Sequence, residues 1–281
     1  MTREGVHDYD WLVVGSGFGG SVAALRLAEK GYRVAVLEQG RRYADSDFAA
    51  DAREVAKVWW QPRLGLRGIM KLTTFKHVTV ISGVGVGGGS LVYANTLYVP
   101  HSDDFYRHPA WGDLADWRGE LAPHYAEASR MLGVTKCTAD GPSERLMREL
   151  AVDVGAPDGF RNTPVGVHFG EPGRTVPDPY FGGEGPARTG CISCGQCLLG
   201  CRHGAKNTLV KNYLWLAERR GASVLADTEV VEVAPLDGAG GSGERGYSVT
   251  HRRPGPIRGR AVQLTAGGVV IAAGALGPNK L

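Results

Sequence analysis

A short apolar run that leads into a glycine-rich turn most constrains the fold of this 281-residue chain. The run at residues 11–14 is followed by the motif G-x-G-x-x-G at residues 15–20, and the acid Glu38 follows a second apolar run at residues 33–37. In a strand–turn–helix unit the first glycine permits the tight turn, the second lets the backbone approach a pyrophosphate, and the third lets the helix pack on the strand. The pattern therefore predicts a site for the ADP half of a dinucleotide.

The other positions of a longer βαβ fingerprint are also filled, which argues against a chance glycine loop. They are Ala24, Leu27, Gly31 and Val34. The predicted cofactor contacts in the turn are Gly15, Ser16, Gly17, Phe18, Gly19 and Gly20. The helix would direct unpaired N–H groups at the phosphates, and Glu38 would accept hydrogen bonds from a ribose diol. The acid favours FAD or NAD over NADP, and the motif alone does not separate FAD from NAD.

A second glycine-rich segment follows a predicted strand at residues 78–81. It carries glycine at positions 83, 85, 87, 88 and 89, just before the apolar residues 91–93. Such a density of glycine indicates either a flexible segment or a backbone that lies against something large and flat. Apolar strand residues on both sides are unusual for a flexible linker. We therefore favour close approach to a ligand.

The composition is that of an ordinary soluble globular protein, with 43% hydrophobic and 22% charged residues. The net charge of +3 is small and the basic residues are dispersed, so nothing points to nucleic acid. No apolar run approaches the ~20 residues that a membrane span needs, and no apolar signal segment precedes the first predicted strand. These features predict a cytoplasmic protein, with peripheral contact with a membrane left open.

The rest of the chain is predicted to alternate between regular elements and long loops. Apolar residues at helical spacing predict a packing helix over residues 114–132, which Gly133 would end. Residues 155–190 are rich in proline and glycine and predict a long structured loop. Further predictions are a helix over 208–220, strands over 223–225 and 230–233, and a buried strand over 269–274.

Four of the five cysteines are closely spaced in the pattern C-x2-C-x2-C-x3-C, which is that of a bacterial ferredoxin cluster loop. They are Cys191, Cys194, Cys197 and Cys201. Two observations argue against a cluster: no second cysteine run exists, and Arg202 stands where a proline commonly follows. The alternatives are an iron–sulfur site, which would relay electrons to an acceptor other than oxygen, and reduced thiols packed under the long loop. Both stay open, and Cys137 is expected to be structural.

Several motifs together resemble the glucose-methanol-choline (GMC) family of FAD-dependent oxidoreductases, most closely its cholesterol-oxidase-like members. They are the N-terminal dinucleotide motif and residues 83–95, 190–209 and 272–277. The resemblance implies that the first glycine block holds the pyrophosphate and that the second lies beside the isoalloxazine ring. It also implies backbone contact of Val230 with the adenine, and close approach of residues 273 and 274 to the ADP moiety. The cofactor residues added in this way are Gly85, Gly89, Ser90, Tyr93, Asn95, Val230, Ala273 and Gly274.

The resemblance implies an α/β fold: a Rossmann-type FAD-binding domain with part of an α+β substrate domain, and with the C-terminal half missing. Residues 8–100 would form the first part of the FAD-binding domain. Residues 101–220 would form a partial substrate or cap region with the cysteine-rich loop, and residues 221–281 would return to the FAD-binding domain. No catalytic residue is assigned, because the family's catalytic histidine and its Asn or His partner follow the segment that corresponds to residues 272–281. They are expected beyond Leu281.

The implied activity is FAD-dependent oxidation of a secondary alcohol to a ketone by hydride transfer to flavin N5. The expected substrate is the 3β-hydroxyl of a sterol or another hydrophobic alcohol, with double-bond isomerisation as a second step and oxygen or another acceptor to reoxidise the flavin. The chain by itself is expected to be inactive and to aggregate or purify with little flavin. One alternative is a non-catalytic FAD or iron–sulfur module that acts with a partner chain. An NAD-dependent dehydrogenase is another, which the second glycine block argues against.

Overall fold

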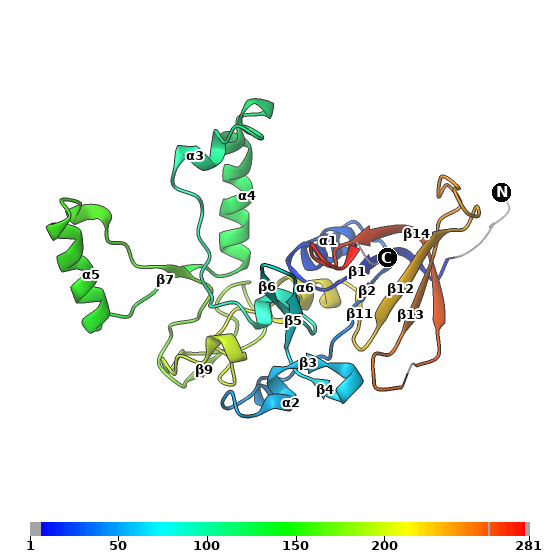
Figure 1. Ribbon diagram of the computed structural model, residues 1–281, viewed down its shortest axis with the longest axis horizontal. Helices are drawn as coiled ribbons and strands as arrows, with labels where there is room; N and C mark the ends of the chain where they lie inside the picture. Colours follow the sequence, from blue (N-terminus) through cyan, green and yellow to red (C-terminus); the bar gives the residue numbers. More distant parts are fainter. Residues whose placement is uncertain (1–6, 258, 279–281) are drawn as a thin grey trace.

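The computed structural model describes residues 7–257 and 259–278, and its centre is a six-stranded sheet (Figure 1). The strand order is β11-β2-β1-β14-β13-β12. The strands are β1 (Tyr9–Val14), β2 (Val34–Leu37), β11 (Ser223–Leu225), β12 (Glu229–Pro235), β13 (Tyr247–Arg252) and β14 (Val262–Ile271). The first four in this order run parallel, and β13 and β12 continue the sheet in antiparallel pairing. Strands from both ends of the sequence thus form one α/β sheet, which confirms the predicted Rossmann-type fold.

The parallel part of the sheet is buried on both faces. Every residue of β2 is buried, as expected where helices or loops cover both sides of a parallel strand. On one face α1 (Phe18–Glu29) and α6 (Tyr213–Arg219) pack side by side, and their apolar residues join Val13 and Val36 in the main core. The opposite face carries a smaller cluster that includes Leu12 and Leu37. This packing fixes the carboxyl ends of β1 and β2, where the predicted site begins.

The predicted helix over 208–220 is shorter than expected. A 3-10 turn, η7 (Leu209–Lys211), precedes α6, and the two are separated at Asn212, whose φ of −143° and ψ of −99° are not helical. The Asn212 side chain accepts a hydrogen bond from Tyr213 N at 2.6 Å and so caps α6. Gly221, with φ of 91°, follows the helix, as predicted.

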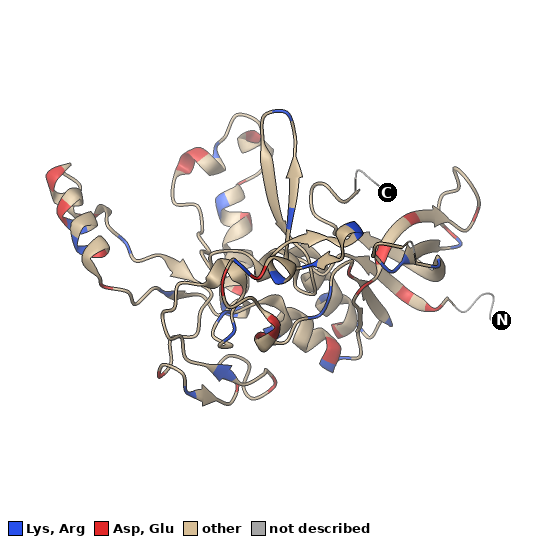
Figure 2. Cartoon of the chain, turned by 60° about the horizontal axis from the view of Figure 1, so that its bottom comes forward, with Lys and Arg blue, Asp and Glu red and all other residues tan. Residues whose placement is uncertain are grey.

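The excursion between β2 and the second glycine block contains short elements around a separate apolar cluster. They are η1 (Asp45–Asp47), α2 (Val55–Val58), β3 (Trp60–Gln61), η2 (Pro62–Leu64), β4 (Leu66–Arg67), β5 (Met70–Thr74) and β6 (Thr79–Gly83). Strands β5 and β6 pair as an antiparallel hairpin, with the predicted strand at 78–81 in its second arm. Figure 2 shows this hairpin standing out from the body, and acidic and basic residues interspersed along the chain.

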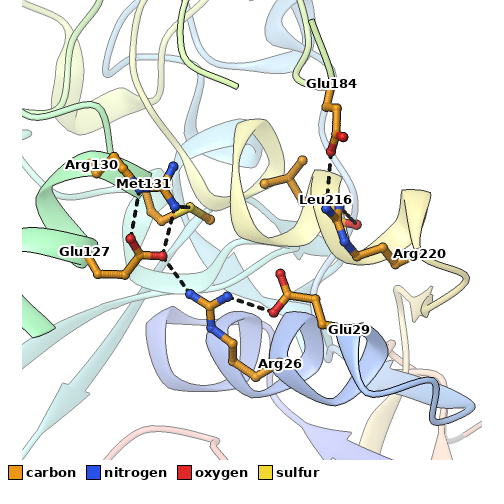
Figure 3. A network of polar contacts seen from close by, with 8 residues as sticks. All are labelled: Arg26, Glu29, Glu127, Arg130, Met131, Glu184, Leu216 and Arg220. Carbon is orange, nitrogen blue, oxygen red and sulfur yellow. Dashed lines mark hydrogen bonds and ion pairs between the residues drawn. The ribbon is translucent and has the colours of Figure 1, made fainter. Parts of the chain in front are cut away.

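The predicted packing helix over 114–132 is α4 (Trp117–Met131), and its burial differs from the prediction. Leu114 lies in a 3-10 turn before the helix and is 75% exposed, and within α4 only Met131 is buried. The end of α4 joins α1 in two ways: Met131 packs in the main core, and Glu127 accepts a hydrogen bond from Arg26 of α1 at 2.8 Å as well as one from Arg130 of α4 at 2.8 Å (Figure 3). The helical spacing is therefore confirmed. The predicted face is only partly buried within α4, at Trp117, Leu121, Tyr125 and Ala128, and becomes buried at Leu132.

The remaining elements lie mostly to the left of the sheet in Figure 1, where α3, α4 and α5 stand away from it. They are α3 (Asp103–Tyr106), η4 (Gly112–Leu114), β7 (Thr135–Lys136), α5 (Pro142–Asp153), η5 (Pro157–Gly159), β8 (Pro164–Val165), β9 (Thr175–Val176), β10 (Arg188–Thr189), η6 (Cys197–Leu199) and, by the glycines, η3 (Gly88–Leu91). The predicted loop over 155–190 is thus largely irregular, with short two-stranded pairings.

None of the described helices is long and apolar enough to cross a membrane. Residues 1–6, to which the prediction of a missing signal segment refers, lie outside the described residues. The cytoplasmic location and the three-part domain division stay predictions.

Candidate cofactor site

The first glycine loop (residues 15–20) joins β1 to α1 by a turn that only glycine fits. Gly15 has φ of 99°, and a Cβ atom there would lie 2.6 Å from the Ala272 carbonyl oxygen. A Cβ atom on Gly20 would lie 1.9 Å from the Gly15 carbonyl oxygen. Contacts this short are incompatible with a side chain. The predicted roles of the first and third glycines, the tight turn and the close packing of the helix, are thereby confirmed.

The middle of the same loop is open. No heavy atom lies within 4 Å of the Cβ position at Gly17 or at Gly19. Gly17 is the N-cap of α1 and offers no side-chain acceptor to the first amide groups of the helix. Open space in front of amide groups at a helix N-terminus suits a phosphate group. The residues therefore fit a pyrophosphate, as predicted from the motif.

Glu38 is buried between the glycine loops, with 5% of its surface exposed. Its carboxylate accepts hydrogen bonds from Ser16 N at 3.2 Å, Ser16 Oγ at 2.7 Å, Gly40 N at 2.9 Å and Gly85 N at 3.3 Å. Burial raises the pKa of Glu38, although these hydrogen bonds act to lower it. The carboxylate thus joins three segments of the protein, a role that the motif does not predict. A ribose diol would have to replace one of these donors.

The second glycine loop (residues 83–89) packs directly on the first. A Cβ atom on Gly88 would lie 2.8 Å from Gly17 Cα, and one on Gly85 would lie 2.7 Å from the Tyr43 ring. Both glycines also have positive φ angles, 52° and 130°. At these two positions the atoms that exclude a side chain belong to the protein. A ligand is therefore not needed to explain glycine at these two positions, and close approach of the loop to a ligand stays a prediction.

Gly89 lies in a more open place than its neighbours. The nearest heavy atom to its Cβ position is in the Phe18 ring, at 3.8 Å. Phe18 belongs to the first loop, and its ring stands edge-on to that of Tyr93 with 5.9 Å between centroids. The two glycine loops and these two rings therefore form one continuous surface, on which Gly89 is a position that leaves room for a ligand.

Of the three polar residues predicted after the second loop, Ser90 and Tyr93 are held by side-chain hydrogen bonds. Ser90 Oγ donates to the Gly87 carbonyl at 2.7 Å and is fully buried. The Tyr93 hydroxyl donates to the Asn207 carbonyl at 3.2 Å, and burial raises the pKa of Tyr93. Asn95 has φ of 66°, an unusual backbone for a residue other than glycine, and its buried Oδ1 has no hydrogen-bond partner. This oxygen is one of six buried side-chain nitrogen and oxygen atoms without a hydrogen-bond partner among the described residues.

The last three predicted cofactor residues come from the C-terminal strands. Ala273 follows β14, and its Cα would lie 3.1 Å from a Cβ atom on Gly15, so it borders the first loop. Gly274 has φ of 70° and open space around its Cβ position. Val230 lies on β12 opposite His251, at the outer edge of the sheet. The structure therefore brings Ala273 to the first glycine loop, with Gly274 next to it in the chain, and places Val230 at the edge of the sheet.

The cysteines do not form a metal site. Within residues 7–257 and 259–278, no three His, Cys, Asp or Glu side chains are grouped as ligands for a metal ion. The iron–sulfur interpretation is therefore not supported. All five cysteines, Cys137 included, instead line a cavity of about 350 Å³ whose walls are largely apolar. Cys137, Cys191 and Cys201 pack against the small cluster that contains Val165 and Val167.

Two buried cations near this cavity are residues that sequence reasoning missed. Arg188 and Lys206 are each 1% exposed, and neither takes part in an ion pair among the described residues. Burial lowers the pKa of both groups, that of Lys206 to about 7. Arg and Lys side chains in a predicted loop are usually exposed, so the residue type did not indicate that these two are buried. For Lys206, the one available signal was its place inside the motif at 190–209.

Comparison with protein families gives two matches. Residues 13–44 match the NAD(P)-binding Rossmann-like domain, and residues 187–281 match the GMC oxidoreductase family. The first match covers the end of β1, α1 and β2 with Glu38. The second begins just before the cysteine-rich loop and includes the strands β11 to β14.

Two relatives share high sequence identity with the chain. A cholesterol oxidase of Mycobacterium tuberculosis is 57% identical over 228 residues, which cover 79% of this chain and 39% of that protein. A cholesterol oxidase of Acinetobacter baumannii is 49% identical over 248 residues, which cover 87% of this chain and 44% of that protein. The chain therefore spans less than half the length of these relatives.

Among solved structures, the pyridoxine 4-oxidase from Mesorbium loti has a similar fold. The TM-score is 0.56 with 20% sequence identity, and the match covers 95% of this chain and 50% of that one. At this identity the likeness shows the fold alone.

Proposed function

Because the chain belongs to the GMC oxidoreductase family, we propose that it binds FAD across its two glycine loops and forms part of an enzyme that oxidises a secondary alcohol to a ketone. One observation carries this proposal. The two glycine loops touch where Gly88 meets Gly17. The buried Glu38 accepts hydrogen bonds from both loops, from Ser16 of the first and from Gly85 of the second. A nicotinamide site built on the first loop alone would not need the second.

Each part of the site has a proposed role in holding FAD. The open space at Gly17 and Gly19, in front of α1, would receive the pyrophosphate. Glu38 would exchange one of its protein donors for a ribose hydroxyl, and Gly274 would lie beside the ADP half. The open side of Gly89 would face the isoalloxazine ring. Val230 would contact the adenine through its backbone, as the resemblance implies.

The proposed substrate is the 3β-hydroxyl of a sterol, supported by the two relatives named cholesterol oxidases. In the net reaction the alcohol loses two electrons and two protons, and oxygen as acceptor takes them up as hydrogen peroxide. The bound flavin supplies the electron sink for this oxidation. Residues 15–20 and 83–89 would hold and orient it. The catalytic base is proposed to lie outside residues 1–281. The proposal also includes isomerisation of the ring double bond as a second step, and an acceptor other than oxygen as the alternative for reoxidising the flavin.

The test is to purify the native protein from its source, record its visible absorption spectrum, and measure ketone and peroxide formation with cholesterol. A flavin spectrum with production of cholestenone and an equal amount of peroxide is expected for the complete enzyme. A flavin spectrum without turnover would favour the alternative of a non-catalytic FAD module that works with a partner chain. A protein that binds NAD and no flavin would overturn the proposal.

A further inference from the structure

The segment at residues 206–209 forms hydrogen bonds with residues 90–93, which follow the second glycine loop. Lys206 Nζ donates a hydrogen bond to the Leu91 carbonyl at 2.8 Å. The amide of Leu209 donates to Ser90 Oγ at 3.0 Å, and the Asn207 carbonyl accepts from the Tyr93 hydroxyl at 3.2 Å. Three contacts from four consecutive residues thus hold one short stretch of chain, residues 90–93. None of these contacts was expected from the motif at 190–209.

Lys206 is the ionisable member of this support. Its Nζ also donates to the Cys197 carbonyl at 2.8 Å and lies 4.8 Å from the centroid of the Tyr93 ring, within cation–π range. A buried ammonium without an acidic partner is unfavourable unless its donors are used. Here two donors reach backbone carbonyls from segments more than 100 residues apart, so the ammonium joins the end of the second glycine loop to the cysteine-rich loop.

A change at Leu91 would be felt in the first glycine loop. Leu91 ends η3, which begins at Gly88, and Gly88 is the residue whose Cβ position lies 2.8 Å from Gly17 Cα. Within η3, Ser90 N donates to the Gly87 carbonyl at 3.1 Å, so the turn moves as a unit. If the Leu91 carbonyl lost its donor, the turn would be free to shift against the first loop. Both surfaces proposed to hold the flavin would then be disturbed.

We propose that Lys206 is a positioning residue for the flavin: it holds the turn at 88–91 against the first glycine loop by joining the Leu91 and Cys197 carbonyls. This inference rests on the proposed function only in naming flavin as the ligand. Lys206 lines the cysteine-lined cavity and directs its donors at the Leu91 and Cys197 carbonyls, so we do not place it in contact with the cofactor. Its effect on the flavin would pass through the backbone of the second loop.

The test compares Lys206→Met, Lys206→Arg and the control Lys211→Met. Lys211 lies in the same stretch of chain but pairs with Asp45 at 2.6 Å and not with the glycine loop. We would measure FAD affinity by quenching of flavin fluorescence, and hydrogen exchange of the amides at residues 85–93. Lys206→Met should weaken FAD binding about tenfold and speed exchange at 88–91. Lys206→Arg should recover most of both, and Lys211→Met should match the wild type.

The outcomes separate this inference from the proposed function. If the wild-type protein binds no FAD, the proposed function fails. Faster exchange at 88–91 in Lys206→Met would then still show that Lys206 holds this turn in place. If the wild type binds FAD and a folded Lys206→Met binds it equally with unchanged exchange, the inference is wrong. If Lys206→Met does not fold, the same hydrogen-exchange measurement is made on Lys206→Gln. Faster exchange confined to 88–91 supports the inference, and a uniform change across β1 and β14 overturns it.

Discussion

The apolar residues of the central sheet and those of α5 have opposite surroundings. All of β2 is buried, and α1 buries Ala24 and Leu25 against it. In α5 only Ala151 is buried, while Leu146 and Leu150 are 63% and 49% exposed. Both regions have regular secondary structure, so propensity and capping suffice to form the helix of α5. The glycine loops beside the sheet therefore owe their shape to packing within this chain. In contrast, α5 presents an apolar face that no described residue covers.

The sharpest way to break this comparison is to add one methyl group to the first glycine loop. Gly20→Ala places Cβ 1.9 Å from the Gly15 carbonyl oxygen, so α1 must move away from β1. We expect a loss of about 3 kcal/mol or more in the free energy of unfolding, measured by urea denaturation. Gly19→Ala, one residue earlier with open space, should be neutral or stabilising by up to about 1 kcal/mol. Equal effects of the two substitutions would show that the close contact is absent in solution.

Removing the charge that joins the loops should have the next largest effect. Glu38→Gln puts an amide group opposite backbone N–H donors and should cost up to about 2 kcal/mol of unfolding free energy at acidic pH and less near neutral pH. Because the folded-state pKa of Glu38 is raised above 4.5, the carboxyl group stays protonated to a higher pH in the folded protein than in the unfolded chain. Its contribution to stability is therefore present below that value and is lost as pH rises through the folded pKa. Denaturation at several pH values should show this slope in the wild type and lose it in the variant.

Lys206 should give a pH dependence of opposite sign. Its pKa falls from 10.5 to about 7 on folding, so between these values the unfolded chain binds the extra proton. The wild type should therefore gain stability relative to Lys206→Met as pH rises from about 7 to about 10. Thermal unfolding of both proteins across this range measures the difference. A constant difference would mean that Lys206 is solvated in the folded state.

The smallest effect is expected on the exposed side of the comparison. Leu150→Ala should change the free energy of unfolding by less than about 0.5 kcal/mol, because the side chain is already 49% exposed. Leu25→Ala, on the buried face of α1, should cost about 2–5 kcal/mol. Light scattering should also show less self-association for a Leu146→Ser, Leu150→Ser double variant. A large loss of stability in Leu150→Ala would mean that α5 is covered in solution.

Most of the fold could be predicted from local pattern, and the exceptions have identifiable physical causes. The strands and α1 follow from apolar runs and from glycines with fixed steric roles. The helix before Gly221 is shortened because Asn212 caps it, a competition that periodicity does not register. The face expected for α4 is only partly buried, since amphipathic spacing predicts a face but not how fully it is covered. For the second glycine loop, the density indicated close approach but not that the neighbour is the protein itself.

The sequence by itself determined the first glycine loop, the acid after the second strand and the family, because these depend on residues at short fixed spacings. Only the tertiary structure decided that Glu38 joins both loops, that the five cysteines face one cavity, and that Lys206 is buried behind Leu91. Each of these depends on contacts between segments far apart in the chain. Burial and hydrogen-bond satisfaction are properties of such contacts, and a one-dimensional pattern does not contain them.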